Sequence, residues 1–176
     1  MSTSAVDWAR VKADFPVLQQ SLDGRRIVYL DSANTSQKPN QVIDAMAAFM
    51  RTGYAPINRS AYRLAAAATD AFEGARGKVQ KFINAPRANE VVFTKNATES
   101  LNLIAHSWGG ANLKRGDAVV LTHMEHHANI VPWHMLAAER GIEIRWIPLT
   151  TDGELDLTDL DRLLDGAKAQ IGRAHV

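Results

Sequence analysis

The sequence contains no cysteine, which excludes disulfide bonds, thiolate metal sites and a cysteine nucleophile within these 176 residues. No apolar run approaches the length of a membrane span. The N-terminus also lacks the apolar core of a secretory signal. Basic and acidic residues are interspersed and nearly equal in number, at 20 and 19, so neither nucleic acid nor a membrane surface is an expected partner. Together these absences favour a cytoplasmic protein.

The second half of the chain has the alternation of a parallel α/β fold. Apolar residues make up 46% and charged residues 22%, which is typical of a globular domain with a core. Nearly continuous apolar strands are predicted at 90–94, 117–123 and 142–149, with helices at 97–109 and 128–141 between them. This order predicts an α/β fold whose sheet is mostly parallel and is joined by crossover helices.

The first half is predicted to be mainly helical. A short helix is expected at 7–15, a strand at 26–31, and longer helices at 39–53 and 62–84. A last short helix is expected within 155–165. Apolar residues recur at helical spacing in the longest helix and predict one buried stripe, made of Leu64, Ala68, Phe72, Ala75, Val79, Phe82 and Ile83.

The junction between a strand and a helix at FTKNATESLN (93–102) is a candidate anion site. Asn96 is a good N-cap, and Glu99 follows at the spacing of a capping box. The start of such a helix offers free N–H groups at the edge of the sheet where ligands bind. Ala97 permits close approach to the backbone, and Thr98 adds a hydroxyl. The alternative is a capped helix without a ligand.

A second candidate site is rich in histidine. Four of the six histidines lie within residues 122–134: His123, His126, His127 and His134. A histidine at the carboxyl end of the 117–123 strand can cover a planar cofactor and move protons. His126 and His127 are adjacent and point in different directions, and the spacing matches no familiar zinc signature, so no metal is expected. His127 and His134 are interpreted as packing or surface residues. A metal-binding module stays an alternative.

Two further segments of the sequence are informative. The small residues of LDSANTSQKP (30–39) would let a ligand meet the backbone at a strand end, although a simple turn explains them as well. The terminal IGRAHV (171–176) can be back-translated into the start of a common sequencing adapter. We therefore treat 171–176 as a non-native tail and leave it out of the reasoning on the fold.

Read in order, the motifs resemble one enzyme family, and the resemblance runs from about Val6 to about Asp165 with the spacing preserved. The sequence is similar to the cysteine desulfurases that serve iron–sulfur cluster assembly, the SufS-like group of the class V aminotransferases. These enzymes use pyridoxal 5′-phosphate (PLP) and have fold type I. The motifs that carry the resemblance are FPVL, YLDSAN, SQKP, VIDA, VVFTKNATESLNLIA, GDAVVLTHMEHHANIVPWHMLA and IPLTTDGELDL.

The resemblance implies roles for individual residues. The position of His126 is that of the histidine which stacks on the PLP ring and acts as an acid or base. Ala97 and Thr98 stand where the family binds the PLP phosphate. Ala33 and Asn34 belong to the segment near the substrate carboxylate. The family has two histidines in the loop that here contains Asn58 and Tyr62, so the substrate-facing loop departs from the pattern more than the cofactor site does.

The resemblance also implies a domain plan and partners. Residues 1–60 would contribute to the small domain and the active-site entrance, and 61–170 would begin the PLP-binding large domain. The family's Schiff-base lysine, its pyridine-pairing aspartate and its persulfide-forming cysteine lie further along than this chain extends. The implied protein is a homodimer that converts L-cysteine to L-alanine and passes sulfur to an acceptor protein. This chain alone would be inactive.

The alternatives fall into two classes. The first is another class V PLP enzyme, such as a selenocysteine lyase, an epimerase or an aminotransferase. The second is a truncated product with no function of its own.

Overall fold

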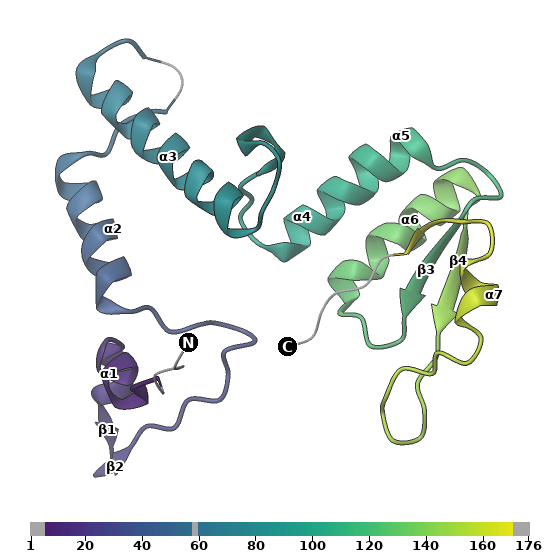
Figure 1. Cartoon of the computed structure of the whole chain (residues 1–176), viewed down its shortest axis with the longest axis horizontal. Helices are drawn as coiled ribbons and strands as arrows, with labels where there is room; N and C mark the ends of the chain where they lie inside the picture. The colour runs from purple at the N-terminus through teal and green to yellow at the C-terminus, as the bar shows by residue number, and fades with distance from the viewer. Residues whose placement is uncertain (1–5, 58–59, 171–176) are drawn as a thin grey trace, which may run out of the picture. The chain divides into compact units, whose positions relative to one another are not determined.

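The computed structural model describes residues 6–57 and 60–170, and the chain divides into two compact units, residues 1–91 and 92–176 (Figure 1). Asn58 and the expected tail at 171–176 lie outside the described residues. Within the described part, no helix is long and apolar enough to cross a membrane.

The three helices expected in the first unit are confirmed. Helix α1 spans Trp8–Ala13, α2 spans Asn40–Thr52, and α3 spans Arg63–Phe82. Local signals set their ends. The Asp7 carboxylate accepts a hydrogen bond from the backbone N–H of Arg10 at 3.1 Å, as an N-cap does. Short 3-10 turns at Pro16–Gln19 (η1) and Ala88–Glu90 (η2) complete the helical part.

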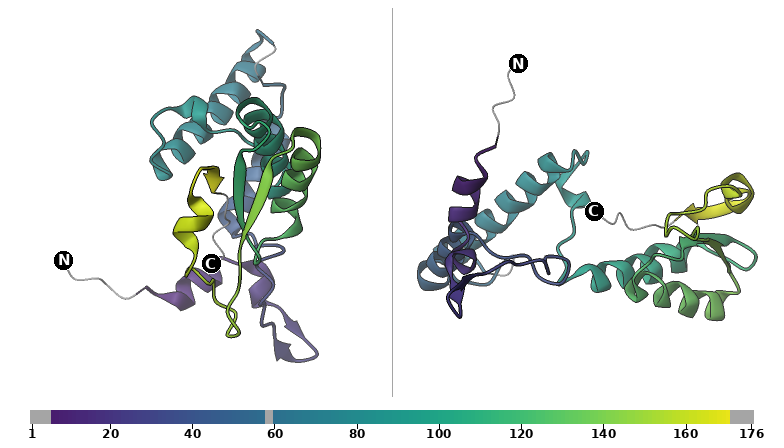
Figure 2. Two further views of the ribbon diagram at one scale, coloured as in Figure 1. Left: turned by 90° about the vertical axis from the view of Figure 1, so that its right-hand side faces the viewer. Right: turned by 90° about the horizontal axis from the view of Figure 1, so that it is seen from below.

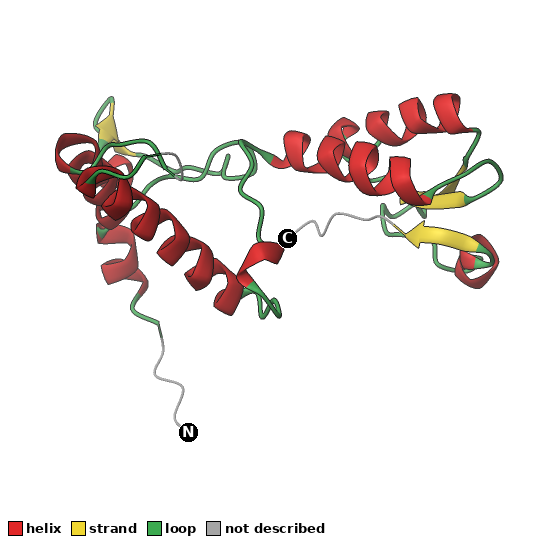
Figure 3. Cartoon of the chain, turned by 90° about the horizontal axis from the view of Figure 1, so that it is seen from above, coloured by secondary structure: helices red, strands yellow, loops and turns green. Residues whose placement is uncertain are grey.

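The strand predicted at 26–31 is wrong. The structure has instead a small antiparallel hairpin, β1 (Ser21–Leu22) with β2 (Arg25–Arg26), closed by Asp23 and Gly24, both at positive φ. An Asp-Gly pair is a strong signal for such a turn. Beyond β2 the described chain continues without a strand as far as α2 (Figure 3), and Leu30 is 90% exposed. A strand needs a hydrogen-bonding neighbour along its length. Here Arg26 pairs with Ser21 in the hairpin and the Ile27 N–H donates to the Gln20 carbonyl at 3.4 Å, and beyond Ile27 the segment pairs with no strand within the described residues.

The buried stripe predicted for α3 is largely wrong. Ala65 and Ala68 are its buried residues, whereas Phe82 is 91% exposed and Leu64 and Ile83 are also exposed. An apolar stripe is buried only where another segment packs on it. Helix α3 contacts η2, and Ala68 and Phe72 line a hollow together with Phe49 and residues 54–57. Much apolar surface of the unit is therefore left open to solvent.

The second unit contains a three-stranded parallel sheet of order β4-β3-β5. Its strands are β3 (Ala118–Thr122), β4 (Glu143–Ile147) and β5 (Ala167–Gln170). The parallel pairing of the predicted 117–123 and 142–149 strands is confirmed, as is the α/β fold class. The strand predicted at 90–94 is wrong: these residues pair with no strand in the described structure, and the Val91 carbonyl accepts instead from Arg76.

Helices cover both faces of this sheet. Helix α6 (Val131–Arg140) lies on one face and α7 (Leu160–Leu164) on the other, as the left view of Figure 2 shows. Alternate residues of β3 point to the two opposite faces of the sheet, one covered by α6 and the other by α7. Val119 and Leu121 join the core on the α6 side, and Val120 packs with the α7 side. All three are fully buried, which explains why β3 is apolar as far as its last residue, Thr122.

The helix predicted at 97–109 forms, with a local change of geometry. It begins as α4 (Ala97–Ile104), continues through a π-helical turn, η3 (Ala105–Gly109), and ends as α5 (Gly110–Asn112). The π turn packs against α6. Gly109 is buried there, and a Cβ on it would lie 2.8 Å from Leu136 Cδ2, so the two helices approach as closely as a glycine allows.

Candidate functional site

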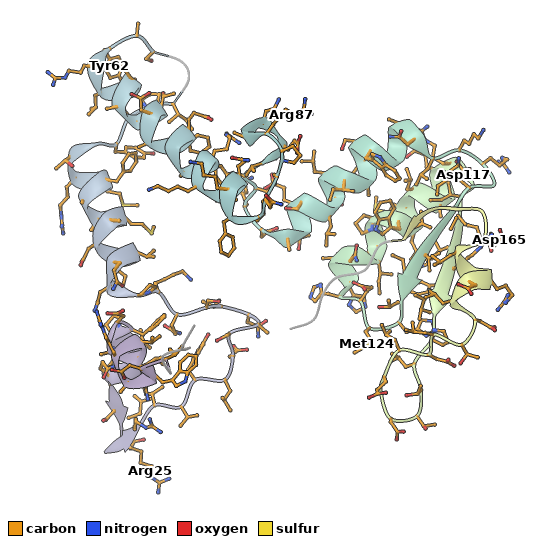
Figure 4. All side chains as sticks on the ribbon, viewed as in Figure 1. Arg25, Tyr62, Arg87, Asp117, Met124 and Asp165 are labelled. Atoms are coloured by element: carbon orange, nitrogen blue, oxygen red, sulfur yellow. The ribbon has the colours of Figure 1, made fainter. Side chains whose placement is uncertain are left out.

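The loop that follows β3 is fixed by a buried carboxylate. It starts after Thr122, and Met124, which lies in it, is labelled in Figure 4. Glu125 is only 7% exposed. Its Oε1 accepts from the Thr122 hydroxyl at 2.9 Å, so the loop is tied back to the strand from which it comes. A buried carboxylate is stable only when hydrogen bonds replace its hydration.

The hydrogen bonds continue from Glu125 into the core. Asn129 is fully buried, and its Nδ2 donates to Glu125 Oε2 at 2.8 Å. Its Oδ1 accepts from the indole Nε1 of Trp133 at 3.3 Å. Trp133 is itself fully buried in the core on the α6 side of β3. The side chains of Glu125, Asn129 and Trp133, each four residues from the next, thus link the loop to the hydrophobic core.

His126 directly follows Glu125 in the loop that these hydrogen bonds fix. It is the N-cap of η4 (His127–Asn129), and its Nδ1 accepts from the backbone N–H of Ala128 at 3.1 Å. Its carbonyl accepts from the N–H of Asn129 at 2.7 Å. The ring is exposed, so it is positioned by the backbone and yet open to a ligand.

The start of α4 has the capped form that the sequence predicted. Asn96 Oδ1 accepts from the N–H of Glu99 at 2.9 Å, and Glu99 Oε2 accepts from the N–H of Lys95 at 2.6 Å. The first N–H groups of a helix have no acceptor within the helix. The Asn96 side chain binds the N–H of Glu99 and does not bind the N–H groups of Ala97 and Thr98. Ala97 and Thr98 are exposed. An anion could therefore reach two N–H groups and one hydroxyl.

Helix α4 and η4 contact each other, which brings the start of α4 and His126 into the same part of this unit. Helix α6 crosses back from the carboxyl end of β3, and α4 leads towards the amino end of β3. Both helices therefore begin on the side of the sheet to which β3 points (Figure 1). The expectation that Ala97, Thr98 and His126 face one crevice stays a prediction.

Two of the other histidines in the cluster pack against a tryptophan. The rings of His123 and His134 both lie against Trp146, with centroid separations of 5.2 and 5.9 Å. His126 and His127 meet edge to face at 6.4 Å. In the described parts of the chain, no group of three or more histidine, aspartate or glutamate side chains is arranged to hold a metal ion.

Ala33 and Asn34 belong to the other unit and lie in an exposed turn. The Asn34 amide donates to Asp31 Oδ1 at 2.7 Å, and its N–H donates to the Asp31 carbonyl at 3.2 Å. A turn was the simpler of the two interpretations of this segment. Contact of Ala33 and Asn34 with a substrate stays a prediction.

Sequence reasoning missed Glu125 and Asn129 as supporting residues. A signal was available, because Glu125, Asn129 and Trp133 recur every four residues across the start of a helix. Their burial could not be read from this spacing, since polar residues at helical intervals are more often solvated.

Residues 28–173 match the family Aminotransferase class-V. The match covers most of the chain, and the protein belongs to this family. Similar proteins include the cysteine desulfurases of Salmonella gallinarum and Salmonella typhimurium, each 48% identical over 167 residues. These residues make up 95% of this chain and 41% of either relative. The resemblance inferred from the motifs is thus confirmed.

Solved structures give the same result for the fold. The apo cysteine desulfurase of Thermococcus onnurineus NA1 is 35% identical, with a TM-score of 0.83 over 98% of this chain and 41% of its own. The cysteine desulfurase CsdA of Escherichia coli is 34% identical, with a TM-score of 0.77 over 95% of this chain and 41% of its own. The expected fold class, the N-terminal part of a fold-type I enzyme with an incomplete parallel sheet, is confirmed.

Proposed function

We propose that this chain is the cofactor-binding, N-terminal part of a PLP-dependent cysteine desulfurase. The observation that carries the proposal is that one unit contains both an exposed histidine fixed by the backbone, His126, and the open helix start at Ala97 and Thr98, and that α4 and η4 contact each other in it. The similarity to cysteine desulfurases over nearly the whole chain supports it. The complete reaction would convert L-cysteine to L-alanine and place the sulfur on a protein persulfide for iron–sulfur cluster assembly.

The residues present fit PLP. The N–H groups of Ala97 and Thr98, with the Thr98 hydroxyl, form an anion site at the positive end of α4 that suits the phosphate. When bound, PLP supplies an electron sink for bonds at the substrate α-carbon. Asn96 leaves the anion site open because its side chain is engaged with the third N–H of the helix, that of Glu99.

His126 would cover the cofactor ring and move protons. The imidazole is exposed and flat, and a hydrogen bond at Nδ1 fixes its orientation, so Nε2 is the ring nitrogen that is left to face the cofactor or the substrate. Ala33 and Asn34 would lie near the substrate carboxylate. A homodimeric state, a sulfur-acceptor partner and action in the cytoplasm belong to the same proposal.

The 176 residues alone are expected to release no sulfide from cysteine, because they contain no cysteine that could form a persulfide. A chimera is therefore the appropriate test. Residues 1–170 would be joined to the segment of the Salmonella gallinarum cysteine desulfurase that follows the matched region. We expect the purified chimera to retain PLP, visible as absorbance of the bound cofactor. A folded chimera that never binds PLP would contradict the proposal.

Thr98 provides the matched comparison within this experiment. Thr98→Ala removes the hydroxyl and should weaken PLP retention by about 1.5–3 kcal/mol, the range for a hydrogen bond to a charged group. Thr98→Ser keeps the hydroxyl and should retain PLP nearly as well as the parent chimera. Equal retention by all three proteins would remove Thr98 from the phosphate site.

A further inference from the structure

The ring of His126 is held in one orientation by a turn rather than by its own packing. The turn runs from His126 to Asn129, and two hydrogen bonds close it, one from the N–H of Ala128 to Nδ1 and one from the N–H of Asn129 to the His126 carbonyl. The ring itself is exposed. Whatever fixes the Asn129 end of the turn therefore also fixes the ring at the other end.

Asn129 is fixed by partners that allow one orientation of its amide. The indole N–H of Trp133 can only donate, so the atom of Asn129 facing it must be the oxygen. The amide nitrogen then points at residue 125, which must present an acceptor there. A carboxylate meets this requirement because both of its oxygens accept. The direction of donation thus runs from Trp133 through Asn129 to Glu125.

The hydrogen bond at Nδ1 has a chemical consequence. A neutral imidazole carries one N–H, and Nδ1 must be the unprotonated nitrogen if it accepts from Ala128. The proton therefore lies on Nε2, at the exposed edge of the ring. In the opposite tautomer, Nδ1 would carry the proton and its N–H would face the N–H of Ala128. That tautomer therefore requires the turn to open.

We infer that Glu125 and Asn129 are positioning residues that hold His126 in the neutral tautomer with its proton on Nε2, where the ring donates a hydrogen bond. Glu125 and Asn129 need not touch a cofactor or substrate to do so, since they act through the turn and the Ala128 N–H. The value of this arrangement for catalysis rests on the proposed function, but the tautomer itself is a property of this chain and can be measured without cofactor.

The test is nuclear magnetic resonance of the 176-residue chain with ¹⁵N-labelled histidine, above about pH 8, where imidazoles are neutral. Long-range ¹H–¹⁵N correlations identify which ring nitrogen carries the proton. His127, which is adjacent and also exposed, is the internal reference. We expect His126 to be more completely protonated at Nε2 than His127. We also expect the Ala128 amide to be protected from exchange. An equal tautomer distribution in the two rings, or an unprotected Ala128 amide, would overturn the inference.

Two variants separate hydrogen bonding from charge. Glu125→Gln can still accept from Asn129 through its oxygen, while its amide nitrogen donates to the Thr122 hydroxyl, which can accept as well as donate. It should keep the His126 tautomer. Glu125→Met has a similar size but no acceptor. It should bring the His126 distribution to that of His127 and speed exchange of the Ala128 amide by about tenfold.

The outcome does not depend on the stability of the methionine variant, because the unmodified chain and Glu125→Gln are decisive by themselves. Loss of the tautomer in Glu125→Gln would overturn the inference. So would an unchanged tautomer in a Glu125→Met protein whose Trp133 indole signal shows an intact core. Failure of the chimera to bind PLP would count against the proposed function and leave the tautomer result unaffected.

Discussion

Gly109 lies against Leu136 so closely that a Cβ on residue 109 would stand 2.8 Å from Leu136 Cδ2. The contact joins the π turn of the first helix of the second unit to α6. Helix α6 begins just after the turn that carries His126. The placement of that turn relative to the start of α4 therefore depends on how closely these two helices approach.

Gly109→Ala is expected to lower the free energy of unfolding by about 1–3 kcal/mol, the usual cost of forcing extra volume into a packed core. The backbone of Gly109 is ordinary right-handed helix, so backbone strain does not contribute. Chemical denaturation of the purified chain measures the effect. Gly110→Ala is the matched control, because a Cβ there meets only the end of the Arg140 side chain at 3.8 Å.

The control should move in the opposite direction. Gly110 has helical backbone angles, and alanine is favoured over glycine in a helix by about 0.5–1 kcal/mol, so Gly110→Ala should stabilise the chain slightly. Equal effects of the two substitutions would mean that the close approach of Gly109 and Leu136 is absent in solution.

Asn129→Ala is expected to be strongly destabilising. It removes one hydrogen-bond partner from the buried carboxylate of Glu125 and one from the indole of Trp133, and each loss costs about 1–3 kcal/mol. Asn112→Ala is the matched control: its exposed amide donates to the Trp108 carbonyl, and its loss should change stability by no more than about 0.5 kcal/mol. Similar urea midpoints for the two variants would show that the buried chain of hydrogen bonds does not stabilise the fold.

Asp156 provides a prediction for pH. The hydroxyl of Thr158, and then its backbone N–H, donate to the Asp156 carboxylate and lower its pKa below the ordinary 3.8. A carboxyl whose pKa is lower in the folded state stabilises that state above its ordinary pKa, and the contribution disappears as the pH falls through the lowered value. Thr158→Val keeps only the backbone donor, so it should raise the pKa of Asp156 part of the way back. Titration followed by carboxyl NMR measures it, and an unchanged pKa would contradict this assignment.

Local signals explain which elements the sequence could predict. Asp7 and Asn96 cap helices, Gly141 ends α6 in the left-handed conformation, and β3 is apolar apart from its last residue, so short stretches of sequence predict these elements. The apolar 90–94 segment was wrongly predicted as a strand because apolar character does not supply a pairing partner. Strand β5 was not predicted, because its AKAQ sequence has no strand pattern. These residues form a strand because they pair with β3.

The site was predictable to the extent that its residues carry a motif. His126 and the Asn96 cap follow from short patterns, and the cap forms as expected. The support beneath His126 was not predictable in the same way. It depends on the burial of Glu125 and Asn129, which is a consequence of how α6 and β3 pack and not of the residues in the loop.

The most direct measurement of the central claim is alanine formation from L-cysteine by the chimera described above, with His126→Ala and His127→Ala compared in the same protein. We expect the parent chimera and His127→Ala to form alanine at similar rates. The His127 ring lies edge-on to His126, and among the described residues the His127 side chain makes no hydrogen bond to the turn. His126→Ala should be slower by about 10²–10⁴-fold, as when a positioned acid or base is lost. Near-parental turnover by His126→Ala in a PLP-loaded chimera would contradict the account.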